Sequence, residues 1–294
     1  MAEYLLASPS TTIGADASAT VTMTASEDGV CRLSTLGLMA FVDTDIVIGN
    51  GDFSSWLSVS SVVVYGNYEL IQGDNTPVPP SSVLNPLRKI NFIGGAYGFQ
   101  DLVLKTGSTV AVTVNNAHAT ASGNISIGAA FRPTGQTLKS YPIPPNAQGL
   151  YFGTPVAEVA GGGTTGTLTF TSSISGVASL SSLVIRGMTD VNANASYIDL
   201  VPGMGISAIT LANKQGIVIG DGSLEAPGAM LSGDRANSWV DFGNYKISPQ
   251  QTITIDFANN GKSGINGNFS AGMIIYPDAG AGIQQPCPAP PPCR

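Results

Sequence analysis

Hydrophobic and polar residues alternate along most of this chain, in short runs that end at glycine, proline or asparagine. In Thr109-Val110-Ala111-Val112-Thr113-Val114 every second residue is valine, which is typical of a strand with one buried face. No long segment shows the spacing of an amphipathic helix. The pattern therefore predicts an all-β chain.

The alternating runs form two series of eight predicted strands, rich in the β-branched and aromatic residues that strands favour. The first series covers residues 19–25, 30–42, 56–65, 68–72, 88–93, 100–105, 109–115 and 123–132. The second covers residues 166–172, 177–187, 196–201, 206–212, 216–220, 238–247, 251–257 and 267–276. The longest break, from 72 to 86, holds four prolines and is predicted to be a loop.

The two series are copies of one domain. Gly, Asn, Ser, Gly and Pro recur at five matched places in two strands that lie 144 residues apart. The matched residues are Gly123, Asn124, Ser126, Gly128 and Pro133 in the first copy, and Gly267, Asn268, Ser270, Gly272 and Pro277 in the second. An offset of 147 residues relates earlier segments, such as Gly73-Asp74 and Gly220-Asp221. We expect these repeat-defining residues to support the fold.

The duplication divides the chain into five segments. Residues 1–18 are predicted to be an N-terminal arm, loosely held or borrowed by a neighbour, and 19–133 the first domain. Residues 134–165, which include Pro142, Pro144, Pro145 and a run of three glycines, are predicted to be a linker. Residues 166–278 form the second domain, and 279–294 a Pro-rich tail. We expect the arms and the linker at intersubunit contacts, so loss of the tail should impair assembly more than folding.

Eight antiparallel strands in about 115 residues fit two packed sheets, and the jelly roll is the recurrent eight-stranded arrangement of that kind. The immunoglobulin-like sandwich is the alternative, with seven strands and a buried tryptophan. Trp56 and Trp239 stand at places that do not match between the copies. The predicted fold is therefore two tandem jelly rolls.

The charge content is low: 11% of the residues are charged, and the net charge is −7. The twelve basic residues are scattered, and Arg88-Lys89 is their only adjacent pair, so nucleic acid is not expected as a direct partner. A positive mean hydropathy of +0.21 favours a surface that is partly covered by neighbouring subunits. The first residues lack a signal-peptide pattern, so we expect synthesis in a cytoplasm.

No candidate for catalysis or dinucleotide binding stands out. A triad or a His-rich metal site would depend on His118, the single histidine, which we interpret as a solvated loop residue. Ser126 lacks the helix that follows a nucleophile elbow. Gly203-Met204-Gly205 is followed by a predicted strand and not by a helix that could hold a pyrophosphate. No cofactor is expected.

Metal and disulfide sites are not expected either. Asp43, Asp45 and Asp52 are too loosely spaced for a calcium loop and are interpreted as turn carboxylates. Cys31 lies in a predicted strand as a small buried side chain. Cys287 and Cys293 are separated by a proline run that, in polyproline II geometry, holds their Cα atoms roughly 19 Å apart, too far to pair.

A tandem pair of eight-stranded domains with extended arms and sparse charge resembles the double jelly-roll major capsid proteins of icosahedral viruses. It is most similar to the compact ones of tailless, membrane-containing bacteriophages. The resemblance implies a homotrimer in which six jelly rolls form a pseudo-hexagonal capsomer of the virion shell. It also implies contacts with other capsid proteins, such as a penton or spike, and with an internal membrane. The arms here carry no amphipathic helix or basic patch.

Two other function classes are alternatives to the capsid protein. A tandem jelly-roll binding module, such as a lectin-like protein or a phage fibre or spike component, would use loop aromatics to bind a sugar. A bicupin or a jelly-roll hydrolase would need several histidines or paired carboxylates at matched positions in the repeats, which this sequence lacks. The sequence therefore favours a structural protein over an enzyme.

Overall fold

The computed structural model describes nine ranges of the chain: residues 2–42, 57–70, 99–135, 139–145, 147–190, 197–199, 203–231, 240–261 and 266–278. Regular structure in these ranges is β-strand, apart from one 3-10 helix, η3 (Gly228–Leu231). The all-β prediction is confirmed. The predicted strand 88–93, the predicted loop 72–86 and the tail 279–294 lie outside the described residues.

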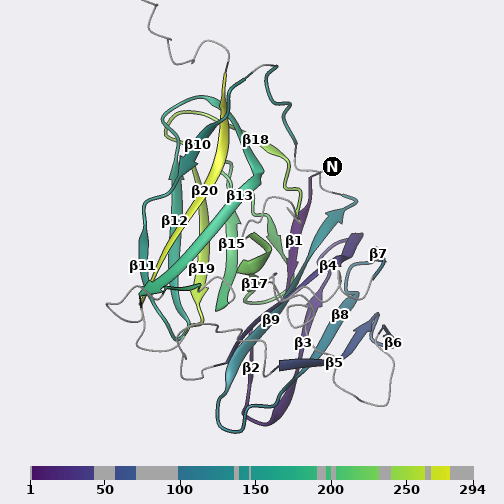
Figure 1. The fold of residues 1–294 in the computed structure, drawn as a ribbon. Coiled ribbons are helices and arrows are strands. Elements are labelled where there is room, and N and C mark those ends of the chain that lie inside the picture. The colour runs from purple at the N-terminus through teal and green to yellow at the C-terminus, as the bar shows by residue number, and fades with distance from the viewer. Residues whose placement is uncertain are drawn as a thin grey trace, which may run out of the picture.

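The strands of the first half form two sheets (Figure 1). One has the order β1-β9-β4-β7, with β2 also paired to β9, and the other has the order β3-β8-β5-β6. Their bounds are β1 (Tyr4–Ala7), β2 (Thr11–Ile13), β3 (Ala17–Thr24), β4 (Gly29–Val42), β5 (Leu57–Val64), β6 (Tyr68–Glu69), β7 (Leu102–Leu104), β8 (Thr109–Asn116) and β9 (Gly123–Pro133). Every second residue of β8 faces the core: Val110, Val112 and Val114 are buried, as their spacing predicts.

The second half repeats this arrangement (Figure 1). Its first sheet has the order β10-β20-β13, with β11 on β20 and both β14 and β18 on β13, and its second has the order β12-β19-β15-β17. The bounds are β10 (Leu150–Gly153), β11 (Ala157–Ala160), β12 (Thr164–Thr171), β13 (Gly176–Asp190), β14 (Tyr197–Asp199), β15 (Met204–Thr210), β16 (Val218–Ile219), β17 (Ala226–Pro227), β18 (Asn244–Ile247), β19 (Thr252–Asn259) and β20 (Asn266–Pro277).

The two halves match down to their irregularities. The pairing of β4 with β9 shifts register between Arg32 and Gly37, and that of β13 with β20 shifts at the equivalent place of the repeat, between Ser179 and Val184. The register shifts in β5 and β15, at Val59/Ser61 and Ile206/Ala208, are likewise equivalent under the repeat offset. Bulges at matched positions are the mark of a copied domain, because they depend on local sequence.

Two segments differ from their prediction. Residues 1–18 are not a loose arm, because β1 and β2 lie in them and pair with β9. Residues 134–165 are not only a linker, because β10 and β11 lie in them and pair with β20 in the same way. Each half therefore opens with a pair of short strands along its last strand, β9 in the first half and β20 in the second. The domain boundaries at 19 and 166 stay a prediction, and the structure places these strand pairs before them.

Each half has its own hydrophobic core, and β1 contributes to both. Leu6 packs in the core of the first half, with residues such as Val112 and Phe131. Leu5 and Ala7, on the other side of the strand, pack with the core of the second half. Because successive side chains of a strand point to opposite faces, this one short strand joins the two cores.

Candidate functional site: the junction between the two halves

Strand β1 lies between a strand of its own half and a strand of the other. It pairs antiparallel with β9 along its whole length and parallel with β16 at Leu5↔Val218 and Leu6↔Ile219. The backbone N–H of Leu5 donates to the carbonyl of Ile217 over 2.8 Å. The β1-β9-β4-β7 sheet thus extends from the first half into the second.

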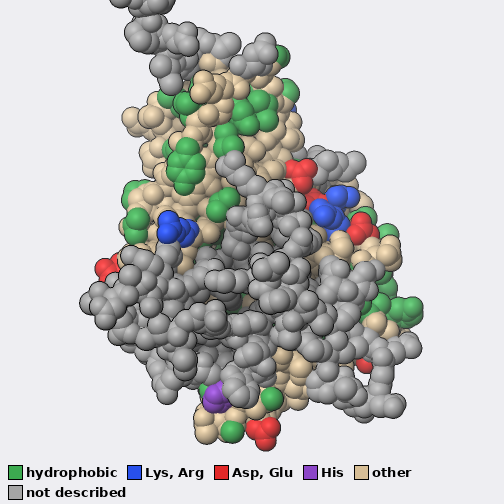
Figure 2. Space-filling model, in the orientation of Figure 1, with side chains coloured by type: hydrophobic (Ala, Val, Ile, Leu, Met, Phe, Trp, Pro, Cys, Tyr) green, Lys and Arg blue, Asp and Glu red, His purple; other side chains and the backbone are tan. Residues whose placement is uncertain are grey.

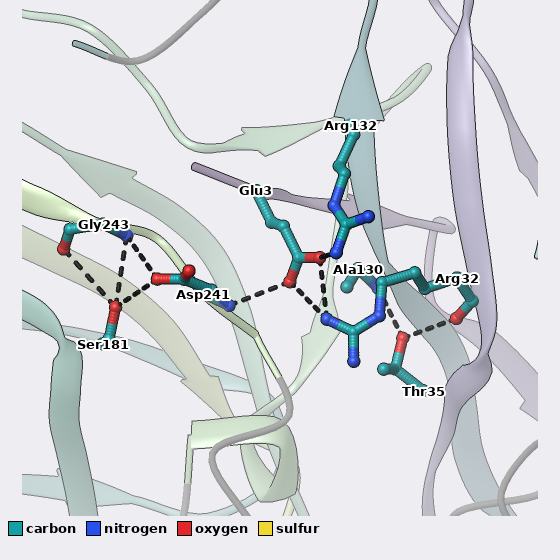
Figure 3. Close-up of polar contacts among 8 residues, drawn as sticks. All are labelled: Glu3, Arg32, Thr35, Ala130, Arg132, Ser181, Asp241 and Gly243. Carbon is teal, nitrogen blue, oxygen red and sulfur yellow. Dashed lines mark hydrogen bonds and ion pairs between the residues drawn. The ribbon is translucent and has the colours of Figure 1, made fainter. Parts of the chain in front are cut away.

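A buried carboxylate stands at the start of this strand (Figure 3). Arg32 Nη1 donates to both oxygens of Glu3 over 2.7 Å, and Arg132 Nη2 lies 2.8 Å from Glu3 Oε1. The Glu3 side chain is 0% exposed, while those of Arg32 and Arg132 keep 25% and 42% of their surface. Two arginine side chains that remain partly exposed to water thereby compensate the charge of one fully buried carboxylate.

The second half completes the cluster through its backbone. The N–H of Asp241 donates to Glu3 Oε2 over 2.9 Å, and the N–H of Glu3 donates to the Asp241 carbonyl over 2.6 Å. The Asp241 side chain is itself held, since its Oδ1 accepts from Ser181 Oγ at 2.6 Å and from the Gly243 N–H at 3.0 Å (Figure 3). Glu3, Arg32, Arg132 and Asp241 form what we call the Glu3 cluster.

Contacts continue along the strand beyond the Glu3 cluster. Gln215 donates from Nε2 to the hydroxyl of Tyr4 over 3.0 Å, and burial raises the pKa of that phenol. The Glu225 N–H donates to the Ser8 carbonyl over 2.9 Å, and Pro9 forms an isolated bridge with Leu224. These contacts make the junction an interface that is both apolar and hydrogen-bonded.

Glycines allow the closest approaches. A Cβ at Gly220, whose φ is 145°, would lie 2.5 Å from the Ala7 carbonyl oxygen. A Cβ at Gly128 in β9 would lie 2.8 Å from Pro227 Cδ. A side chain at either position would separate the two halves.

The ten repeat-defining residues lie in β9 and β20, at matched positions of the two central strands. Gly123, Asn124, Ser126, Gly128 and Pro133 pair with Val42, Phe41, Met39, Gly37 and Gly29 of β4. In β20, Asn268, Ser270, Gly272 and Pro277 pair with Met188, Arg186, Val184 and Gly176 of β13, and Gly267 pairs with Val159 of β11. Their contribution to stability stays a prediction.

Individual contacts show the structural role of some of these residues. Thr12 Oγ1 donates to Asn124 Oδ1 over 3.1 Å, which ties β2 to β9. Gly128 lies under Pro227, and a side chain at Gly272 would collide with the Tyr151 ring. The hydroxyl of Ser126 is buried and has no hydrogen-bond partner in the described part of the chain.

The structure places the remaining chemical candidates in structural positions. His118 Nδ1 accepts from the backbone N–H groups of Thr120 and Ala121 at 3.2 and 2.9 Å and so closes its loop. Burial raises the pKa of the Cys31 thiol to about 12, which keeps it protonated and unreactive. Gly203 precedes β15, and Gly205 lies within it. Asp43, Asp45, Asp52, Cys287 and Cys293 lie outside the described residues.

Within the ranges that the structure describes, no three His, Cys, Asp or Glu side chains gather as a metal site would require. In the same ranges, no helix has the length and hydrophobicity needed to span a bilayer.

Sequence reasoning did not find the Glu3 cluster, because its four members come from four distant segments. One signal was present. Glu3 is a lone charge directly before the apolar residues Tyr4, Leu5 and Leu6, and a carboxylate in such a position needs a partner when the run is buried.

Comparison with known proteins adds little. No family model matches the chain, and no curated protein matches it. Among solved structures it is similar to the major capsid protein P2 from bacteriophage PM2, with 8% identity, a TM-score of 0.21, and coverage of 94% of this chain and 100% of that one. Likeness at this level carries no argument for a shared fold or function.

Proposed function

We propose that the chain is a double jelly roll and the major capsid protein of an icosahedral virus shell. The strand order supports the fold. In each half a sheet of the order β1-β9-β4-β7, or β10-β20-β13-β18, accompanies a sheet of the order β3-β8-β5-β6, or β12-β19-β15-β17. In both halves the strand that opens the half lies beside the strand that closes it, β1 beside β9 and β10 beside β20, which fits the jelly roll.

The observation that carries the function is the duplication itself, with the halves joined side by side through β1. One chain then presents two copies of a domain in a fixed relation, and three chains would supply six similar domains to a six-fold environment. Fold alone does not imply function, but a shell subunit needs contact surfaces and no catalytic residues. The low charge and positive mean hydropathy suit a surface that neighbours cover.

Under this proposal the partners are further copies of the chain and other capsid proteins, such as a penton or spike, and the location is the virion of a bacteriophage. An internal membrane is a further candidate partner. The protein has no enzymatic role and requires no cofactor, and it makes no direct contact with nucleic acid.

Negative-stain imaging of the purified protein tests the proposal. We expect hexagonal particles with a mass of about 90 kDa, three times the 30.0 kDa of one chain, or closed shells. Small bilobed monomers at every concentration, with no shells, would overturn the capsid function. A screen for glycan binding would then test the alternative of a tandem jelly-roll binding module.

A further inference from the structure

The outer edge of β10 lacks the strand that covers its equivalent in the first half. Tyr151 in β10 pairs with Ile274, as Leu5 in β1 pairs with Ala130, so the two residues occupy matched positions. Leu5 is 0% exposed: its side chain packs in the core of the second half, and β16 of that half lies beside it in the sheet. Tyr151 is 78% exposed, and in the described part of the chain β10 pairs with β20 only.

A groove lies next to the β10 edge, whereas residues of the second half fill the equivalent place beside β1. In the junction, Pro9 meets Leu224, and the Gly220 backbone packs against Ala7. The matched residues of the second half, Gly153 and Pro155, line an open groove of about 480 Å³ together with Val156, Ala157, Thr167, Thr169 and Thr171. Val156 is 66% exposed, and Figure 2 shows hydrophobic side chains gathered on the visible face in the region of β10, β13 and β20.

The chain carries a second copy of the segment that fills the junction. In the second half this segment starts at Ile217, whose N–H donates to the Ile209 carbonyl over 3.0 Å. In the first half the equivalent residue of the repeat, Leu70, makes the same bond to Val62 over 2.8 Å. Leu70 is therefore hydrogen-bonded to β5 as Ile217 is to β15, and the two segments start in the same relation to these strands.

The sequence after Leu70 keeps what the contact requires. Ile71-Gln72-Gly73-Asp74 stands where Val218-Ile219-Gly220-Asp221 stands in the second half. Gly220 needs to be glycine, since its φ is 145° and a Cβ would meet the Ala7 carbonyl oxygen. Gly73 preserves that glycine.

This segment starts far from the β10 edge of its own chain. β6, which ends just before Leu70, and β10 lie at opposite ends of the molecule in Figure 1. The partner that fits the edge is consequently a second copy of the protein.

We propose that the edge of β10 and its groove bind a second copy of this chain, which enters with the segment that begins at Leu70 and pairs parallel with β10 as β16 pairs with β1. The contact is strand addition to an exposed sheet edge. It is also heterologous, because it joins the second half of one subunit to the first half of the next and can close into a ring. The inference rests on the proposed function and deepens it by naming the contact between subunits.

Paired substitutions and mass measurement test the edge. Tyr151→Arg places a charge in the proposed contact, and Val103→Arg makes the same change at an exposed apolar residue of β7, which is 60% exposed. By native mass spectrometry we expect the wild type and Val103→Arg to form the same oligomer. Tyr151→Arg should raise the dissociation constant about tenfold or more, as loss of a central interface residue does. Equal oligomers for all three proteins would overturn the inference.

A disulfide test identifies the partner segment. In a background with Cys287→Ser and Cys293→Ser, one chain carries Tyr151→Cys and another Ile71→Cys, the counterparts of the Leu5↔Val218 pair. Oxidation of the mixture should give a covalent dimer on a non-reducing gel, well above a control mixture of Val103→Cys and Ile71→Cys chains. A dimer yield no higher than in the control would overturn the inference.

Failure of the proposed contact and failure of the capsid function give different results. Closed shells built by the Tyr151→Arg protein would overturn the inference and leave the capsid function standing. A wild-type protein that neither associates nor forms shells would overturn the capsid function, and the inference with it.

Discussion

Glu3 is buried while both of its arginine partners keep contact with water. Burying a carboxylate is costly, and that cost is offset only when the charge is paired and its oxygens are hydrogen-bonded. Here Oε1 interacts with Arg32 and Arg132, and Oε2 accepts from Arg32 and from the Asp241 N–H. The cluster therefore specifies how the two halves meet, since neither half alone supplies all of its partners.

Glu3→Gln should lower the free energy of unfolding by about 3 kcal/mol, as removal of one partner from a buried ion pair does. Glutamine keeps the shape of the side chain but leaves Arg32 and Arg132 without a counter-charge. Urea unfolding monitored by circular dichroism measures the change. Lys105→Met, which removes the exposed ion pair with Asp28, is the control and should cost clearly less. Equal losses for the two variants would contradict the role of the cluster.

Asp28 predicts an acid dependence of stability at the surface. Hydrogen bonds from Lys105 Nζ and from the Thr106 N–H lower the pKa of this carboxyl to about 2. A lowered pKa in the folded state stabilises the protein above the unfolded pKa, here about 3.9, and that contribution is lost as pH falls through about 2. The wild type should thus be more stable than Asp28→Asn at pH 5, and the difference should vanish near pH 2.

Urea midpoints of both proteins across that range measure the effect. Lys105→Met removes the first cause of the shift, so it should weaken the acid dependence without abolishing it. A difference between wild type and Asp28→Asn that stays constant from pH 5 to pH 2 would contradict the assignment.

At the scale of elements, the long central strands are held at matched bulges by one hydroxyl each. Thr35 donates to the Arg32 carbonyl over 2.7 Å and accepts from the Ala130 N–H over 2.8 Å. Ser182, its equivalent in the second copy, makes the same two bonds to Ser179 and Ile274, both over 2.7 Å. Because a bulge leaves backbone groups unpaired, the hydroxyl supplies the partners that the ladder cannot.

Thr35→Val should destabilise the protein by about 1–3 kcal/mol, because it keeps the shape but leaves a buried N–H unsatisfied. Ser182→Ala should destabilise it in the same direction. The two losses should add in the double variant, since distant sites without shared partners act independently. Chemical denaturation of the three proteins measures this, and a neutral Thr35→Val would show that the hydroxyl does not support the bulge.

At the scale of the whole molecule, the two cores share one strand and are expected to unfold together. Leu6 packs in the first core and Leu5 in the second, although the two residues are neighbours in β1. A loss of β1 from either half would therefore expose apolar surface in both. We therefore expect the two similar domains to behave as one cooperative unit.

Leu5→Ala and Leu6→Ala should each cost about 2–5 kcal/mol, as truncation of a buried leucine does. Scanning calorimetry should show one transition that both variants shift to lower temperature. Two transitions, with each variant shifting a different one, would show that the halves unfold independently.

Pattern alone predicted the all-β class, most of the long strands and the duplication. Runs such as 109–115 alternate clearly because one face of β8 is buried and the other is not. The copies in β9 and β20 were recognisable because glycine, asparagine and proline keep their places in central strands. These features depend on local sequence, and local sequence was sufficient for them.

The strands at the start of each half were not predicted, and tertiary structure explains why. All four residues of β1 are buried, because the core of the first half covers one face and the second half covers the other, so the strand shows no alternation. β10 has the same place in its half but an exposed Tyr151, since no part of the described chain covers its outer edge. Which faces of a strand become buried depends on its neighbours, and the Glu3 cluster and the junction arise only once distant segments meet.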